Sequence, residues 1–297
     1  VLLFHELEAV LAALNAAEIP VIVLKGAALA HTVYRNPAVR PMCDVDLLVQ
    51  ERDLAPALQQ LAQQGYTIIP PLGYRSEVMV RKATAVDIVL ELHWRLFVSP
   101  AYSHAFPLAH AWQSAPHIQI EGAFAQVLPP DALLLHLVGH QVLHHGGLET
   151  QHWLWLHDIA ETLAHYHPQW DWAQVGQQAR ACLLLVPLQE IFGILAREWR
   201  SAPANEALRA WEGLHPLSQE QSLWQSTSQP HSAPARLRAE LASLPWSVRL
   251  KFVWRNLFPP LGYMQHLYGL PSPVMALLYY PYRWGAALQR LWEMRGR

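Results

Sequence analysis

The sequence has little cysteine: Cys43 and Cys182 are the only two in 297 residues. Two thiols so far apart in the chain form neither a disulfide framework nor a cysteine-paired zinc site. Cysteine usage of this kind is typical of a reducing compartment. We therefore expect a cytoplasmic protein.

An excess of basic charge is also missing, because the formal net charge is -2 and the pI is about 6.8. Proteins that bind duplex nucleic acid usually carry a strong basic excess, so this class of partner is not expected. No run approaches the roughly 20 apolar residues that a membrane-spanning helix requires. The nearest candidate, Ala181–Ala196, contains Pro187 and Glu190, and we predict a buried helix there.

Apolar residues, by contrast, are plentiful: 52% of the chain is hydrophobic and 15% is charged, which is enough for a sizeable core. Leu7, Val10, Leu11 and Leu14 recur at helical spacing within residues 4–17, which predicts an amphipathic helix. The run at 21–24 predicts a short buried strand. A further helix follows Gly26, and a strand follows it at 44–49.

Two hairpins are predicted next. Residues 77–82 and 85–94 are rich in β-branched residues and are separated by a short turn at 82–84, and residues 117–128 pivot on Glu121-Gly122. From Asp131 onward helical patterns dominate, at roughly 131–145, 151–166, 171–197 and 204–213. The sequence therefore predicts an α+β protein, with an α/β domain at 1–129 that carries a mixed sheet and an all-helical domain at 130–297.

The strand at 44–49 contains an unusual pair of acids, Asp44 and Asp46. Side chains two apart in a strand point to the same face, about 6.6 Å apart at Cα. Two carboxylates held together in an apolar strand repel each other unless a cation lies between them. A divalent metal is the simplest such cation, and oxygen-only ligands favour Mg²⁺ or Mn²⁺.

A third acid would complete a metal site, and the segment "VDIVLELHW" offers Asp87 and Glu91. Glu91 stands between two leucines in the middle of a strand, where an unpaired carboxylate is costly, whereas Asp87 lies near the turn. We predict that Glu91 is the third metal-binding carboxylate.

Lys25-Gly26 marks the end of the first strand and the start of the following helix. A glycine lets the backbone approach a phosphate closely, the helix N-terminus offers free N–H groups, and the lysine adds a positive charge. We therefore predict nucleotide binding at Lys25 and Gly26. Arg40, and also Arg35, are further candidates for contact with a triphosphate.

This order of elements resembles the nucleotidyltransferase fold of the DNA polymerase β superfamily. More specifically, "LKGAALAHTVYRNPAVRPMCDVDLLV" followed by "LELHW" resembles a bacterial family of nucleotidyltransferases found in some lasso-peptide and exosortase-associated gene clusters. The similarity is dense over 21–50 and good around 86–94. In the helical half, "LLLHLVGHQVLHHGG", "WLHDIAETL" and "LFPPLGYMQHLYG" look like the trailing elements of that family.

The resemblance implies an Mg²⁺- or Mn²⁺-dependent nucleotidyltransferase that moves an NMP, with ATP as the default donor, from an NTP to an acceptor hydroxyl or phosphate and releases pyrophosphate. It makes Asp44, Asp46 and Glu91 the catalytic, metal-binding acids and Lys25-Gly26 the phosphate-facing turn. The acceptor could be a small molecule, a peptide or a protein.

One departure from the superfamily stands directly after the glycine. The superfamily usually has Gly-Ser or Gly-Gly at this turn, whereas this chain has Gly26-Ala27. The departure favours an alternative function, a catalytically inactive accessory protein that holds a nucleotide or a peptide. The three intact acids oppose it.

A third hypothesis comes from the 17 histidines. His136, His140 and His144 lie at i, i+4 and i+8 on one helical face, and His157-Asp158 resembles the central pair of the HD phosphohydrolases. Histidines on an apolar helix are more often packing residues or the wall of a cleft. We rank an HD-type metal site last.

The C-terminal tail is basic and aromatic, with Trp284, Leu288, Leu291 and Trp292 between the charges. Such a helix can contact an anionic membrane surface. We favour instead a terminal helix that is docked by its tryptophans and leaves its arginines in solvent. The basic residues of the tail are Arg249, Lys251, Arg255, Arg283, Arg290, Arg295 and Arg297.

Overall fold

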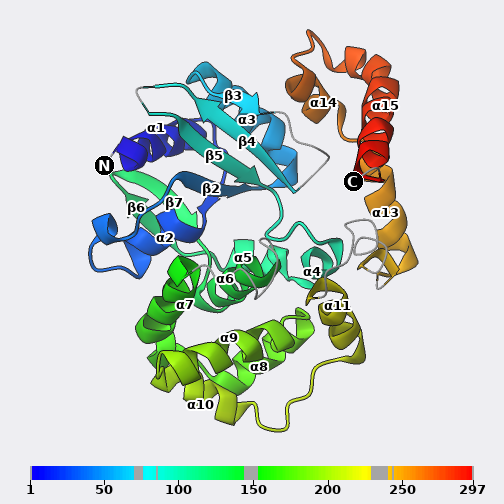
Figure 1. Ribbon diagram of the computed structural model, residues 1–297. Helices are drawn as coiled ribbons and strands as arrows, with labels where there is room; N and C mark the ends of the chain where they lie inside the picture. The colour runs from blue at the N-terminus through cyan, green and yellow to red at the C-terminus, as the bar shows by residue number, and fades with distance from the viewer. Residues whose placement is uncertain are drawn as a thin grey trace.

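Figure 1 shows the computed structural model, in which a mixed sheet forms the N-terminal part and helices follow it. The predicted fold class is confirmed. The structure describes residues 2–69, 76–84, 86–143, 153–228, 240–242 and 244–295, and only the backbone of 266, 287, 288 and 290–295. His144 and Arg297, named above, lie outside the described residues.

The sheet has seven strands in the order β3-β4-β5-β2-β1-β7-β6. β2 runs parallel to β5, and β1 runs parallel to β7, whereas every other neighbouring pair is antiparallel. The strands are β1 (Val21–Val23), β2 (Asp44–Val49), β3 (Thr67–Ile69), β4 (Glu77–Lys82), β5 (Ile88–His93), β6 (His117–Ile120) and β7 (Ala123–Val127).

Helices cover the sheet and then form the rest of the described chain (Figure 1). Those of the sheet region are α1 (Leu2–Ala16), α2 (Lys25–Thr32), α3 (Leu54–Gln63), α4 (Pro100–Ala105) and α5 (Leu108–Gln113). The middle group comprises α6 (Pro130–Leu143), α7 (Trp153–Tyr166), α8 (Trp172–Ala181), α9 (Leu185–Glu198), α10 (Ala202–Ala210) and α11 (Ser218–Ser228). The last are α13 (Trp246–Leu257), α14 (Leu261–Tyr268) and α15 (Ala276–Arg295).

The local predictions for the sheet region are confirmed. The residues that α1 buries are Leu7, Val10, Leu11 and Leu14, the four whose helical spacing predicted the apolar face. β4 and β5 pair as an antiparallel hairpin, as do β6 and β7. In the second hairpin the turn residues Glu121 and Gly122 have φ of 50° and 106°, the left-handed conformation that tight two-residue turns require.

The prediction of one helix over 171–197 is wrong, because α8 and α9 are separate. Leu183 adopts a left-handed φ of 61°. The Leu184 N–H then bonds back to the Ala179 carbonyl at 2.8 Å, and Leu183 N–H bonds to the Arg180 carbonyl at 3.2 Å. This is the usual pattern of bonds that ends a helix, with leucine where glycine is more common. The apolar run around 182–186 concealed the break.

One cluster of buried residues joins the sheet to the helical half. It contains Ile22 of β1 and Leu48 of β2 together with Leu134 and Val138 of α6. The cluster therefore runs across the predicted boundary between 129 and 130, and that boundary stays a prediction.

The C-terminal helices lie along one side of the sheet region, where α14 contacts α3 (Figure 1). Trp284 of α15 donates from its indole to the Leu257 carbonyl at 2.8 Å and stacks on Tyr280. Docking by Trp284 agrees with the favoured interpretation of the tail, and membrane contact stays an untested alternative. Among the described residues, no helix is long and apolar enough to cross a bilayer.

Candidate active site

The register of three central strands gathers acidic side chains on one face of the sheet. On β2 and β5, Asp46 lies opposite Glu91 and Leu48 lies opposite His93. On β4, Glu77 lies opposite His93. The parallel pairing of β2 with β5 is what brings Asp46 and Glu91 together, because residues opposite each other in a sheet face the same side.

Asp46 is the centre of the site. Its Oδ1 accepts a hydrogen bond from Lys25 Nζ at 2.6 Å, and His93 Nε2 lies 2.9 Å from the same oxygen. His93 Nε2 is also 3.4 Å from Glu91 Oε2, and His93 Nδ1 is 3.6 Å from Glu77 Oε2. The side chains of Asp46 and His93 are only 6% and 4% exposed, so these charges interact away from water.

The electrostatics follow from burial and these contacts. Burial alone would raise the pKa of Asp46, but Lys25 and His93 hold it well below its usual value. Burial alone would lower the pKa of His93, but hydrogen bonds to Asp46 and Glu91 raise it to about 9. The same holds for Lys25: burial alone would lower its pKa, but the charge and hydrogen bond of Asp46 raise it above its usual value. At neutral pH the cluster therefore contains two cations, Lys25 and His93, beside its acids.

Asp44 lies apart from this group at the start of β2 and is exposed. Partial desolvation and the nearby charges of Asp46 and Glu91 raise its pKa. Asp44 therefore interacts electrostatically with both carboxylates. Among the described residues, the group whose ligand atoms all lie within 4.8 Å of one another consists of Asp46, Glu91 and His93. The structure thus brings together two of the three predicted acids, with Asp44 at the margin and a histidine at the centre.

The start of α2 lies beside these acids. Leu24 precedes the helix with no side-chain cap, and its N–H bonds to the Asp46 carbonyl at 3.0 Å. Lys25 has a left-handed φ of 45°, an uncommon conformation for a residue with a side chain that often marks functional sites. An uncapped helix N-terminus next to a lysine is suited to bind an anion.

Ala27, where the superfamily usually has serine or glycine, is 1% exposed and belongs to a cluster of buried apolar residues. A serine hydroxyl at this position would lie among apolar side chains. The difference in sequence therefore removes no group that faces the acidic cluster.

Arg40, predicted to bind phosphate, is held by the helical half. Its Nε and Nη2 donate to the two oxygens of Asp158 on α7, each at 2.7 Å, and Nη1 donates to the Pro41 carbonyl. Tyr34 donates its hydroxyl to the same Asp158 at 2.8 Å. A phosphate role for Arg40 stays a prediction, and it requires the guanidinium to leave a buried ion pair. The other candidate, Arg35, is exposed.

Gly26 is explained by its contact with Arg40. A Cβ on Gly26 would lie 3.1 Å from Arg40 Nη1, which is tighter than ordinary contact. The absent side chain thus lets the guanidinium lie against the first turn of α2. Phosphate approach at this glycine stays a prediction.

The HD-type interpretation is opposed by the same contacts. Asp158 is 2% exposed in its side chain and bonded to Arg40, whereas His157 faces Glu161 at 3.6 Å on the surface. The described part of the chain has no group of potential metal ligands at His136, His140 and His157.

His93 is a residue of the acidic cluster that the sequence analysis did not select. The signal was present, because His93 stands two residues after Glu91 and therefore faces the same side of the strand. A buried histidine beside two carboxylates is a strong indication, but burial and register appear only once β5 is paired with β2.

A pH dependence of stability follows for the metal-free protein. Since the pKa of His93 is about 9 when folded and about 6.5 when unfolded, protonated His93 stabilises the fold fully below about pH 6.5, and this contribution is lost as the pH rises through 9. Urea unfolding at several pH values in this window should show a decrease in the free energy of unfolding as the pH rises. The decrease should be absent in His93→Gln, and an equal decrease in that variant would contradict the stabilising role of His93.

The site thus consists of a mixed sheet that holds Asp46 and Glu91 beside the N-terminus of α2. Residues 1–200 match the profile of a family described as uncharacterised nucleotidyltransferases. The chain belongs to this family. No curated protein matches it.

Two solved structures show limited similarity. One is an antigenic nucleotidyltransferase-like protein from Paracoccidioides brasiliensis, at 16% identity and a TM-score of 0.46, over 68% of this chain and 92% of that one. The other is a tRNA nucleotidyltransferase complexed with a primer tRNA and an incoming ATP analogue, at 13% identity and a TM-score of 0.24, over 97% and 100%.

Proposed function

We propose that this protein is a metal-dependent nucleotidyltransferase that moves AMP from ATP to an acceptor hydroxyl or phosphate and releases pyrophosphate. The observation that carries the proposal is the position of Asp46, which is buried between Lys25 and His93, opposite Glu91, and beside the uncapped N-terminus of α2. Membership of the family supports the reaction class.

The donor atoms fit a hard divalent cation. Asp46 and Glu91 offer carboxylate oxygens, and Asp44 lies close by, which suits Mg²⁺ or Mn²⁺. When bound, such a cation would offset negative charge on the reacting phosphate. His93 is protonated at neutral pH and donates to Asp46, so we assign it to holding this carboxylate in position rather than to the metal.

The start of α2 would receive the phosphates of the nucleotide. The first N–H groups of a helix have no partner within the helix and point out of its first turn. Lys25 is the first residue of α2, and its ammonium group lies beside Asp46. Lys25 now neutralises Asp46. If a metal takes over that charge, the lysine is released to the β- and γ-phosphates.

The transfer itself is a displacement at the α-phosphorus. The acceptor oxygen forms a new O–P bond as the bond between the α-phosphorus and the bridging oxygen to the β-phosphate breaks, and pyrophosphate leaves with that electron pair. A hydroxyl acceptor transfers its proton to a carboxylate of the acidic cluster as the new bond forms.

A second candidate function is a nucleotide-binding accessory protein without turnover. It is favoured by one observation, that the Asp46 carboxylate is contacted by two cationic side chains, Lys25 and His93. This candidate predicts ATP binding with no pyrophosphate release on any acceptor.

The proposed role of Glu91 is tested by Glu91→Gln, with Asp87→Asn as the control. Asp87 is a surface carboxylate that directly precedes β5, the strand that carries Glu91. Asp87 is 52% exposed and pairs with Arg81, whereas Glu91 is 19% exposed beside His93. With α-labelled ATP, Mg²⁺ and a pool of hydroxyl acceptors, label transfer and pyrophosphate release should fall about 100-fold in Glu91→Gln, because one charge on the reacting centre is lost. Asp87→Asn should match the wild type.

The same assay decides between the two candidates. Wild-type protein that binds ATP but never forms labelled product supports the accessory function. Equal rates in Glu91→Gln and the wild type would contradict the assigned role of Glu91.

A further inference from the structure

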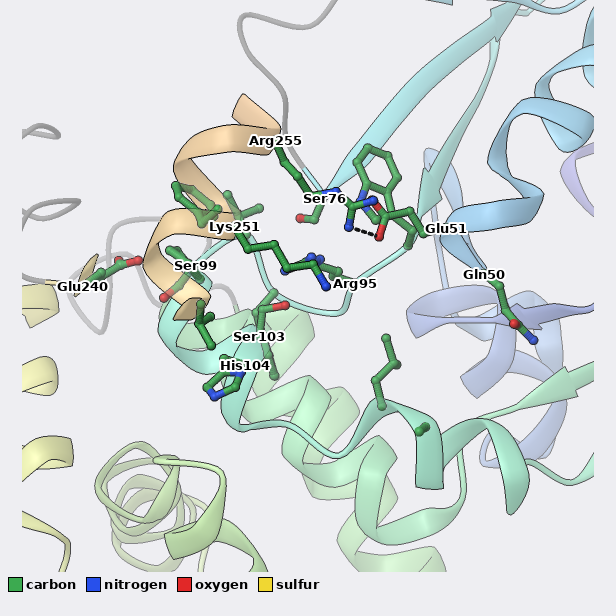
Figure 2. Close-up of a pocket in the computed structure, with 18 of the residues that line it drawn as sticks. Gln50, Glu51, Ser76, Arg95, Ser99, Ser103, His104, Glu240, Lys251 and Arg255 are labelled. Atoms are coloured by element: carbon green, nitrogen blue, oxygen red, sulfur yellow. Dashed lines mark hydrogen bonds and ion pairs between the residues drawn. The ribbon is translucent and has the colours of Figure 1, made fainter. Parts of the chain in front are cut away.

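A second feature of the molecule is a large cavity at the ends of the strands that carry the acidic cluster. It has a volume of about 1050 Å³. Gln50 and Glu51 follow β2, and Trp94 and Arg95 follow β5, and all four line it. Figure 2 shows that α13 and the α4 region supply the other walls, with Lys251 and Arg255 from the former and Ser103 and His104 from the latter.

The cations of this cavity are only partly neutralised. Arg255 donates to Glu51 at 2.7 Å, which ties α13 to the end of β2. Within the part of the chain that the structure describes, Arg95 and Lys251 have no ion-pair partner. In Figure 2 the Lys251 side chain extends toward Arg95, and Glu240 lies away from both, beyond Ser99. Two cations that converge without an acid between them favour an anion as the third member.

The remaining walls are apolar and aromatic. Trp94, Phe97, Trp112 and Phe252 line the cavity. Its volume is at the upper end of those that hold a single organic ligand, which are roughly 300–1,000 Å³. Aromatic walls with a small number of placed charges suit a flat apolar body that ends in an anionic group.

The cavity and the start of α2 lie at different places along β2. α2 begins beside Asp46, whereas the cavity begins at Gln50, four residues or about 13 Å further along the strand. Ser76 lines the cavity and directly precedes Glu77, which faces His93. None of Lys25, Asp46 and Glu91 lines the cavity, so an acceptor anchored at Arg95 and Lys251 has to extend along β2 to bring a hydroxyl to the acids.

We propose that this cavity is the acceptor site, and that the acceptor is an organic anion, a phosphate or carboxylate on an aromatic or apolar body, with its reacting hydroxyl at the far end. Arg95 and Lys251 bind the anionic group, and the aromatic walls bind the body. The assignment of the ligand as acceptor rests on the proposed function, whereas the anion site itself rests on the cavity.

The binding of 1-naphthyl phosphate, measured by calorimetry without metal or nucleotide, tests the site directly. The probe should bind at least about 10-fold more tightly than 1-naphthol or inorganic phosphate alone, because only it uses both the cations and the aromatic walls. Comparison of the affinity for 1-naphthoate with that for 1-naphthyl phosphate shows whether the site prefers a carboxylate or a phosphate. Arg95→Gln and Lys251→Gln should each weaken binding about 10-fold, and Arg81→Gln, an exposed arginine on β4, should leave it unchanged.

Three results would overturn the site: no preference for the naphthyl phosphate, unchanged affinity in both Arg95→Gln and Lys251→Gln, or loss of binding in Lys25→Gln or on addition of ATP, which would place the probe at the nucleotide site. Lys251 is exposed, so its variant tests the site without risk to folding.

The two proposals fail in different ways. If the probe binds as expected but ATP never yields pyrophosphate, the proposed function fails and the anion site stands. If turnover is observed and 1-naphthyl phosphate neither binds nor inhibits it, the anion site and the acceptor assignment both fail and the proposed function stands.

Discussion

Asp46→Asn is expected to reduce pyrophosphate release from ATP by about 10³-fold. Both cations of the cluster, Lys25 and His93, contact the Asp46 carboxylate. The Asp46 side chain is only 6% exposed, so solvent does little to compensate for the loss of its charge. Without it, His93 keeps its longer contact with Glu91, and Lys25 loses its nearest counter-charge. The measurement is label transfer from α-labelled ATP, with Asp87→Asn as the matched aspartate control.

The rise in Tm on addition of metal shows whether Asp46→Asn has lost metal binding or has lost its fold. A cation that binds the folded wild type at about 100 times its dissociation constant should stabilise it by about 2.7 kcal/mol, seen as a rise in Tm. Asp46→Asn should fold and lose this rise. A variant that keeps both the rise and the activity would show that Asp46 serves only to pair Lys25 and His93.

Asp158→Asn is expected to destabilise the protein by about 3–5 kcal/mol, because it leaves a buried guanidinium uncompensated. Arg40 and Asp158 are 6% and 2% exposed in their side chains and form two hydrogen bonds of 2.7 Å. Chemical denaturation measures the change. The matched control is Glu161→Gln on the same helix, which removes only an exposed contact with His157 and should change stability by less than about 0.5 kcal/mol.

The same pair also tests the phosphate role of Arg40. If Arg40 serves only to join the loop before β2 to α7, then Arg40→Gln and Asp158→Asn should affect the KM for ATP equally. A much larger rise of KM in Arg40→Gln would show that the guanidinium contacts the nucleotide. Comparable loss of stability in Glu161→Gln and Asp158→Asn would contradict the importance of the buried pair.

Local structure could be predicted well. The buried face of α1, the two hairpins and the strand that holds Asp44 and Asp46 follow from periods of 3.6 and 2 residues, which backbone geometry imposes on any sequence. The motif around Lys25-Gly26 and the acids sufficed to recognise the family. The exception, the break between α8 and α9, depends on a left-handed leucine that no residue preference indicates.

The interactions that complete the site were decided by tertiary structure. His93 meets Asp46 only because β5 pairs with β2 in parallel and in one register. Arg40 meets Asp158 across 118 residues of chain, and this pair occupies a side chain that was assigned to phosphate. The cavity joins residues near 50, 95, 104 and 251.

The sequence by itself therefore determined the elements, the family and the acids to which we assign the metal, since these depend on residues near one another in the chain. Only the tertiary structure decided which cation neutralises which acid and where a second substrate would lie. Those choices depend on strand register and on the packing of distant segments, and the energies involved arise when charges are buried together.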